Sequence, residues 1–164
     1  MERQELETVI YEKDGPIARI ILNRPEKANA QNSAMVWDVE NSLKDAERDY
    51  LIKVVILKAN GRGFCSGHAV ADGPNAFEEF NRAREAGHPW KGQEDLFLWP
   101  VLHLWEFEKP TISAVQGYAM LDTHTVRTLP ETFLIVVSPL LTVVTSSGCT
   151  TTSVNRLVPV AVVR

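Results

Sequence analysis

Four consecutive apolar residues, Val54 to Leu57, stand between two lysines, Lys53 and Lys58. A strand with one face in water alternates apolar and polar residues, whereas a strand covered on both faces reads as a continuous apolar run. We therefore expect a strand over 53–58 that is buried on both faces. Such a strand belongs to a sheet that other elements cover.

Two shorter strand-like runs precede this segment. Thr8–Tyr11 and Ile17–Leu22 flank the polar turn Lys13–Pro16, a pattern typical of a β-hairpin, and the extra turn residues predict a loop longer than two residues. A helix with Asn32 or Ser33 as its N-cap is expected to run to about residue 50. The order strand, strand, helix, strand predicts an α/β (α+β) fold and not a bundle or a sandwich.

Further along the chain, we expect helical stretches at 74–88 and 94–107 and a strand at 111–116. The charges between 78 and 85 are interpreted as a solvated helix face. His88 and His103 are interpreted as structural residues, since no second ligand stands at metal spacing. The tryptophans suit a core or a subunit contact better than a cofactor site, and they are Trp37, Trp90, Trp99 and Trp105.

The full chain has 164 residues and a formal net charge of −4. This mild acidic excess gives no broad attraction to nucleic acid or to an anionic membrane. The two cysteines, Cys65 and Cys149, argue against a disulfide scaffold and fit a reducing compartment. The first residues lack the apolar stretch of a secretory signal, and the longest apolar run, Phe133–Val144, is too short to span a bilayer. We therefore expect a cytoplasmic protein.

The composition changes abruptly after Met120. Residues 121–164 hold nine threonines and ten valines but no lysine, one glycine and one alanine. Their net charge is +1, against −5 for residues 1–120. This β-branched, apolar composition is the opposite of a disordered one. The break predicts two parts, 1–120 and 121–164.

Two glycine-bearing junctions follow expected strands. Phe64–His68 comes after the strand at 53–58, and Gly117–Met120 comes after the strand at 111–116. Free backbone N–H groups gather at such junctions, and small residues let a ligand approach the chain. Either junction alone is more simply interpreted as an ordinary glycine-bearing connection. Together they could supply the two donors of an oxyanion hole.

Five stretches resemble the crotonase superfamily, the enoyl-CoA hydratase/isomerase family, in order and spacing over nearly all of residues 7–120. They are Gly15–Ile20, Leu22–Ala30, Val54–Leu57, Gly63–His68 and Lys109–Tyr118. The resemblance implies a crotonase-like spiral of ββα turns, of which this chain covers the N-terminal half. It also implies homotrimers or hexamers and an acyl-CoA thioester as substrate, with coenzyme A as part of that substrate and no other cofactor or metal.

The resemblance also implies site residues. The backbone N–H of His68 would be the first oxyanion donor, and the backbone N–H of Asp122 the second. The CoA and acyl channel would be lined by Lys27, Ala28, His68, Ala69 and Val70. The family reaction is the hydration of a 2-enoyl-CoA, in which glutamates move the protons.

The chain departs from the family pattern at the catalytic positions. Ala69 stands where an aspartate is usual, and the two catalytic glutamates fall on Thr125 and on 145–147, which reads Thr-Ser-Ser. A threonine hydroxyl is too weak an acid or base to replace a carboxyl group. Asp122, His124 and Glu131 are the titratable groups nearby. We therefore expect weak or no hydratase activity, and the other reactions of the family cannot be ranked.

Three interpretations of residues 121–164 stay open: a frameshifted reading of a crotonase gene, a divergent ending that packs as strands, or a partly misleading resemblance. Under the first, the segments 133–137 and 140–144 would be aggregation-prone strands. The alternative to an acyl-CoA enzyme is a non-catalytic acyl-CoA binder, a subunit that assembles with intact relatives, or an inactive remnant.

Overall fold

The computed structural model describes residues 1–119, 133–138 and 140–143. The strands are β1 (Glu2–Glu5), β2 (Val9–Asp14), β3 (Ile17–Leu22), β4 (Val54–Ala59), β5 (Thr111–Val115), β6 (Phe133–Ser138) and β7 (Leu140–Val143). The helices are α1 (Ser33–Arg48), α2 (Glu78–Glu85), α3 (Pro89–Gln93) and α4 (Trp99–Glu106), with a π-helical stretch η4 (Glu94–Leu98) and the short turns η1 (Pro25–Lys27), η2 (Val70–Asp72) and η3 (Pro74–Phe77).

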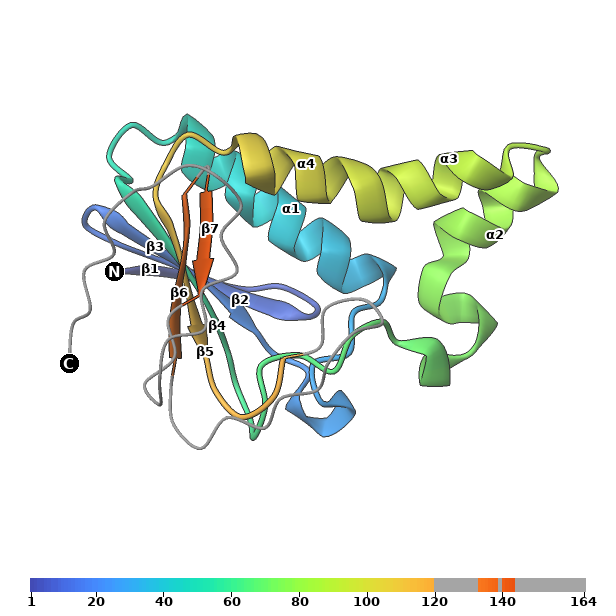
Figure 1. Cartoon of the computed structure of the whole chain (residues 1–164), viewed down its shortest axis with the longest axis horizontal. Helices are drawn as coiled ribbons and strands as arrows, with labels where there is room; N and C mark the ends of the chain where they lie inside the picture. The colour runs from blue at the N-terminus through green and yellow to red at the C-terminus, as the bar shows by residue number, and fades with distance from the viewer. Residues whose placement is uncertain (120–132, 139, 144–164) are drawn as a thin grey trace.

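The strands form one sheet in which they lie in chain order, from β1 to β7. The β3–β4 and β4–β5 pairs are parallel, and the other neighbours are antiparallel. The four helices lie to one side of this sheet (Figure 1). The mixed sheet with helices confirms the predicted α/β class.

The core lies between α1 and the first strands. Val9, Ala18 and Ile20 are fully buried on the side of the sheet that α1 covers, where they join Met35 and Leu43 of the helix in one cluster. The i, i+4, i+8 spacing of apolar residues in α1 accounts for this face. Asn32 caps α1, and its side chain accepts a hydrogen bond from the Met35 N–H at 3.0 Å.

The turn between β2 and β3 is tighter than predicted. Asp14 pairs with Ile17, so the loop consists of Gly15 and Pro16 alone, and the prediction of a longer loop is wrong. Gly15 has φ +57°, which a two-residue hairpin with glycine in first place requires. The strand therefore continues through polar residues that the sequence pattern assigned to the turn.

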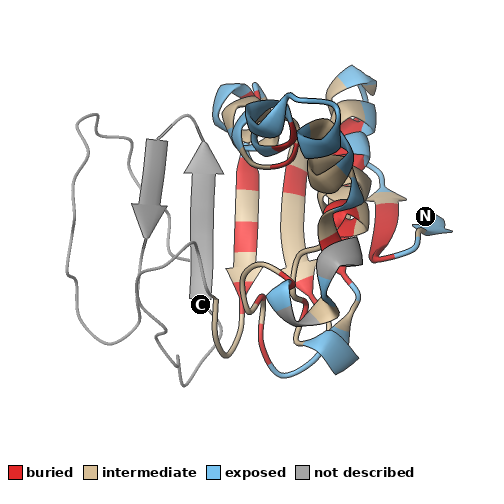
Figure 2. Cartoon of the chain, turned by 90° about the vertical axis from the view of Figure 1, so that its right-hand side faces the viewer, coloured by how far each residue is buried: buried red, intermediate tan, exposed pale blue. Residues whose placement is uncertain are grey.

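The prediction that β4 is buried on both faces is also wrong for the residues described. Val55 and Ala59 are buried, whereas the residues between and beside them are only half-buried. In Figure 2, buried and half-buried residues alternate along the neighbouring strand β5 as well. The physical reason is that the described helices cover one face of the sheet and leave the other partly open.

We call residues 89–106, which comprise α3, η4 and α4, the helical arm. These elements run on from one another as a single rod that projects past the end of α1 (Figure 1). The arm begins five residues before the predicted start at 94, because Pro89 provides the first turn. Leu96 of the arm is buried, and the His103 ring contacts the buried Glu40 of α1, with Nδ1 and Oε2 2.9 Å apart.

Three tryptophans of the arm are exposed, so of the two alternatives predicted for them, a core or a subunit contact, the core is wrong. Trp90, Trp99 and Trp105 are 73%, 54% and 55% exposed. Trp37 is half-buried, and its indole N–H donates to Glu79 at 3.2 Å. The charged helix α2 has no buried residue, which confirms the predicted solvated face. Among the residues described, no helix has the length and apolar character needed to cross a membrane.

Candidate functional site

The two glycine-bearing junctions lie side by side at one edge of the sheet. The N–H groups of Phe64 and Cys65 donate to the Tyr118 carbonyl at 2.8 and 3.3 Å, and Cys65 pairs with Ala119 in a parallel bridge. The junctions follow β4 and β5, which are parallel neighbours, so their chain ends reach the same edge. This confirms the expectation that two separate segments meet there.

Glycine makes this close approach of the two junctions possible. A Cβ atom on Gly117 would lie 2.1 Å from the Arg62 carbonyl oxygen, and one on Gly63 would lie 2.3 Å from the Tyr118 ring. Gly117 also has φ +63°, where a side chain is strained. Gly117 is therefore required by contact with the Arg62 backbone, and Gly63 by the Tyr118 ring that packs against it, independently of any ligand.

The backbone of His68 is presented outward by a short parallel bridge to Gln31. The Gln31 N–H donates to the Gly67 carbonyl, and the Ala69 N–H donates to the Gln31 carbonyl, both at 2.8 Å. In a parallel pairing of this kind, the N–H of the middle residue points away from the partner chain. The His68 N–H has no acceptor among the described residues and is free to contact a ligand.

A buried asparagine connects two loops: residues 23–32, which we call the η1 loop, and residues 60–69, which we call the His68 loop. Asn29 is fully buried, and its side-chain amide donates to the carbonyls of Asn60 at 2.8 Å and Gly63 at 3.1 Å. Its side-chain oxygen accepts from the Arg24 N–H at 2.8 Å. Since every polar atom of this side chain is engaged, the two loops keep a fixed relative position. Sequence reasoning did not identify Asn29 as a structural centre.

Asp72 supplies a carboxylate to the same loops. Its oxygens lie 2.6 Å from the Arg24 guanidinium and 3.2 Å from the Lys27 ammonium. The hydrogen bond from Arg24, followed by that from Lys27, holds the pKa of Asp72 below its ordinary value. The resemblance implies an aspartate at position 69, where this chain has Ala69, and the carboxylate that the structure brings to these loops belongs to Asp72, three residues further on.

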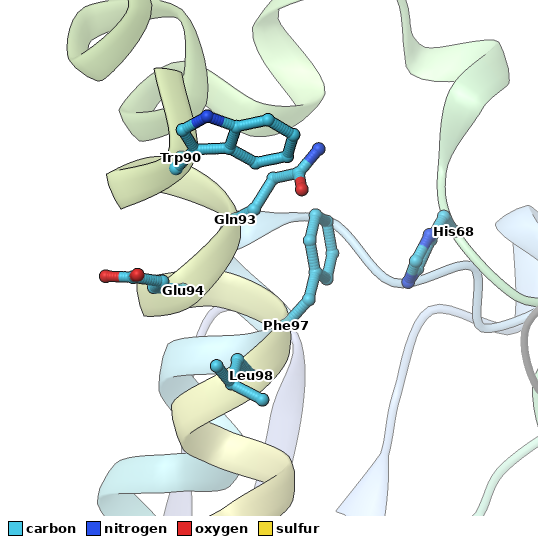
Figure 3. A pocket seen from close by; sticks show the side chains of 6 residues that line it. All are labelled: His68, Trp90, Gln93, Glu94, Phe97 and Leu98. Atoms are coloured by element: carbon cyan, nitrogen blue, oxygen red, sulfur yellow. The ribbon is translucent and has the colours of Figure 1, made fainter. Parts of the chain in front are cut away.

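An open pocket of about 690 Å³ lies between the His68 loop and the helical arm (Figure 3). Its lining residues among those described are His68, Trp90, Gln93, Glu94, Phe97 and Leu98. The His68 and Phe97 rings face each other with centroids 4.4 Å apart, and Phe77 lies edge-on to Phe97 at 5.4 Å. The Glu94 carboxylate extends to the opposite side of the arm from His68.

Of the site residues predicted from the sequence, the structure brings only His68 into this pocket. Ala69 is 2% exposed and its N–H is bonded to Gln31, whereas Val70 is 78% exposed outside the pocket lining. Lys27 and Ala28 lie beside the His68 loop, because the Ser66 N–H donates to the Ala28 carbonyl at 3.1 Å. Asp122 lies outside the described residues.

The arm residues that line the pocket were missed because their Leu- and Trp-rich stretch was interpreted as packing. The candidate acids and bases near 122–131, and the positions 125 and 145–147, lie outside the described residues. Within the described part of the chain, no group of three potential ligands could hold a metal ion. Burial raises the pKa of the Cys65 thiol, which disfavours the nucleophilic thiolate.

Comparison with known proteins gives the same family as the resemblance of the five sequence stretches. A family model described as "Enoyl-CoA hydratase/isomerase" matches residues 12–122. The "Probable enoyl-CoA hydratase 1, peroxisomal" of Arabidopsis thaliana is 30% identical over 68% of this chain and 37% of its own length. The 1,2-epoxyphenylacetyl-CoA isomerase of Escherichia coli is 31% identical over 70% of this chain and 42% of its own length.

A solved structure agrees with these relatives. The crystal structure of an enoyl-CoA hydratase/isomerase from Xanthobacter autotrophicus Py2 aligns with a TM-score of 0.53 at 31% identity, over 70% of this chain and 40% of that one. The chain thus spans about two fifths of the length of the proteins it matches. With a family model that matches residues 12–122 and relatives that agree with it, the chain belongs to the enoyl-CoA hydratase/isomerase family.

Proposed function

We propose that this chain binds an acyl-CoA thioester at the His68 loop, with the acyl group in the pocket along the helical arm. The observation that carries the proposal is the His68 N–H, which has no acceptor among the described residues and belongs to a pocket-lining residue. A thioester carbonyl oxygen is a suitable acceptor, and its charge grows when an enolate forms. The Asp122 N–H is the proposed second donor.

Lys27 is the proposed contact for the charged CoA portion. Its side chain is about half-exposed, and its ammonium group forms an ion pair with Asp72, which also pairs with Arg24. Asp72 is shared between Arg24 and Lys27, so the Lys27 ammonium is not fully engaged and stays accessible from solvent. CoA carries phosphates, and the half-exposed Lys27 ammonium is a cation that a phosphate oxygen can contact.

For catalysis, we propose weak or no hydratase activity in this chain. Addition of water to an enoyl thioester requires a general acid and a general base, which are glutamates in the family. Threonine and serine occupy the corresponding positions 125 and 145–147. We further propose a cytoplasmic location, from the cysteine usage, and no cofactor other than the CoA of the substrate.

Calorimetric titration with crotonyl-CoA tests binding, and the absorbance of the conjugated thioester in the same samples tests turnover. The wild type is expected to bind without measurable hydration. His68→Pro removes the backbone donor and is expected to weaken binding about fivefold or more. The matched control His68→Ala keeps the N–H and is expected to retain most of the affinity. Circular dichroism verifies that both variants fold.

The outcomes separate the alternatives. Hydration at ordinary enzymatic rates would contradict the expected loss of activity. Absence of binding by folded wild-type protein would overturn the proposed function and favour an inactive remnant. Equal affinities of His68→Pro and His68→Ala would show that the His68 N–H does not contact the ligand.

An assembly subunit is the second candidate function, and one observation favours it. Trp99, Val101 and Trp105 expose apolar surface on the arm, which is costly in a monomer. The proposed occupant is another family chain, as the family's trimers or hexamers imply. Sedimentation of the purified chain, alone and mixed with an intact relative, tests this candidate. A monomer under both conditions would contradict it.

A further inference from the structure

The wall of the pocket beside His68 consists largely of ring-bearing side chains among the residues described. Of its apolar lining residues among those described, Trp90 and Phe97 are aromatic and only Leu98 is aliphatic. His68 adds an imidazole ring that faces Phe97, with 32° between the two ring planes. The His68 and Phe97 faces cover each other, so a flat group in this pocket would meet the outer sides of these rings and the Trp90 indole (Figure 3).

The rings on this wall are held in place from behind. Phe77 lies edge-on both to Phe97, at 5.4 Å and 66°, and to His68, at 5.9 Å and 75°. Three rings in mutual contact restrict one another's rotation, so the wall is preorganised before a ligand arrives. Aromatic pairs gain energy beyond their buried area from such edge and offset arrangements.

Trp90 forms the open end of the same wall. Its side chain lines the pocket and yet is largely exposed, so a ligand that covers it removes apolar surface from water. The Gln93 amide extends between the Trp90 and Phe97 rings in Figure 3. The Gln93 amide has no hydrogen-bond partner among the described residues. It can therefore bond a polar substituent on the ring of a ligand.

We propose that the acyl group bound here is aromatic: a CoA thioester whose acyl chain carries an aryl ring close to the thioester. This rests on the proposed function and names the substrate class for it. A rigid, conjugated aryl chain loses little conformational entropy on binding, whereas a straight alkyl chain must fix each of its bonds. Buried apolar area alone favours the alkyl chain, so a preference for aryl isolates the contribution of the rings.

Calorimetry with two nine-carbon probes tests the proposal: trans-cinnamoyl-CoA and trans-2-nonenoyl-CoA. They share the thioester and the α,β double bond and differ in ring against alkyl chain. The wild type is expected to bind the cinnamoyl probe about fivefold more tightly. Phe97→Leu, which keeps an apolar side chain, is expected to abolish this preference with little change for the nonenoyl probe.

Two further variants, both at exposed positions, separate a loss of ring contact from a folding defect. Trp90 is exposed, so Trp90→Leu leaves the core intact, and it is expected to reduce the preference about twofold. Trp105→Leu replaces an exposed tryptophan of the arm outside the pocket and is expected to leave the preference unchanged.

The results distinguish a failure of the aryl preference from a failure of acyl-CoA binding itself. Nonenoyl binding as tight as cinnamoyl binding would overturn the aryl assignment and leave the acyl-CoA function standing. An equal loss for both probes in Phe97→Leu and Trp90→Leu would overturn it too, since the rings would then act without selectivity. Absence of binding for both probes with folded wild-type protein would overturn the proposed function itself.

Discussion

The His68 loop and the helical arm face each other across one pocket, but different forces hold them. The loop is fixed by backbone hydrogen bonds, by the buried side chain of Asn29 and by contact at Gly117. The arm is fixed by a few apolar contacts such as Leu96 and by the His103–Glu40 pair, and its outer side is exposed.

This difference separates two tasks. A backbone donor must keep its position to a fraction of an ångström to contact an oxygen atom, and directional hydrogen bonds provide that accuracy. The wall of an acyl pocket needs only the right shape and polarity, which side-chain packing provides. Substitutions in the arm can therefore change what the pocket accepts without moving the His68 N–H.

The largest effect is expected for Gly117→Ala. The new Cβ would meet the Arg62 carbonyl oxygen at 2.1 Å and would stand on a residue with φ +63°. Backbone strain and the forced shift of the Arg62 segment together are expected to lower the free energy of unfolding by about 3 kcal/mol or more, as measured by urea denaturation.

Gly15→Ala is the matched control for this substitution. Gly15 has φ +57°, but an added Cβ would find nothing within 4 Å. It therefore isolates the conformational cost, which is expected to be about 1 kcal/mol. If Gly117→Ala cost no more than Gly15→Ala, close contact between the two junctions would not be what fixes the loop.

Asn29→Asp is expected to have the next largest effect. The variant keeps the shape of the side chain but replaces the amide that donates to the Asn60 and Gly63 carbonyls. A buried oxygen would then face two carbonyl oxygens, at an expected cost of about 2–4 kcal/mol in urea denaturation.

Asn60→Asp serves as its control, because the Asn60 side chain makes an exposed hydrogen bond to Asn23. A change within about 0.5 kcal/mol is expected there. Comparable losses at positions 29 and 60 would show that the buried amide does not hold the loops together.

A smaller, pH-dependent effect is expected for Asp72→Asn. Because Arg24 and Lys27 lower the pKa of Asp72, its ionised form stabilises the folded chain at pH values above the ordinary value of 3.8. This contribution is lost as the pH falls through the lowered folded pKa. Thermal unfolding is therefore expected to give a lower midpoint for the variant at pH 7 and converging midpoints in strong acid. A difference that stays constant with pH would contradict the ion-pair origin.

The smallest effect is expected on the arm. Trp105→Ser removes an exposed indole that makes no core contact, so the free energy of unfolding is expected to change by no more than about 0.5 kcal/mol. Urea denaturation measures this at several protein concentrations. A large, concentration-dependent loss would indicate instead that this side of the arm is buried between subunits.

Local patterns were sufficient to predict α1, the hairpin and β5. The α1 stripe and its Asn32 cap are short-range signals, and the glycine junctions follow strands that the apolar runs mark clearly. The strand β1 was missed because its four residues are polar and exposed, and it forms only by pairing with β2. The backbone hydrogen bonds to β2 stabilise β1, and these bonds require no apolar pattern in the sequence of β1.

The rest of the site depends on contacts distant in sequence. Asn29 lies more than thirty residues from the carbonyls it binds, and Phe97 lies far along the chain from His68. The segments predicted as strands at 133–137 and 140–144 are β6 and β7, but their pairing with β5 could not be read from their composition. Composition predicts a strand, whereas its neighbour is set by the tertiary fold.

The most direct test of the central claim is the backbone amide signal of His68 in ¹⁵N-labelled protein. Titration with crotonyl-CoA is expected to move this signal downfield, because its N–H gains an acceptor, while CoA without an acyl group leaves it in place. The enoyl absorbance is expected to stay constant in the same tube. An unmoved His68 amide with crotonyl-CoA bound, or the same shift with CoA alone, would contradict the assignment of this N–H to the thioester.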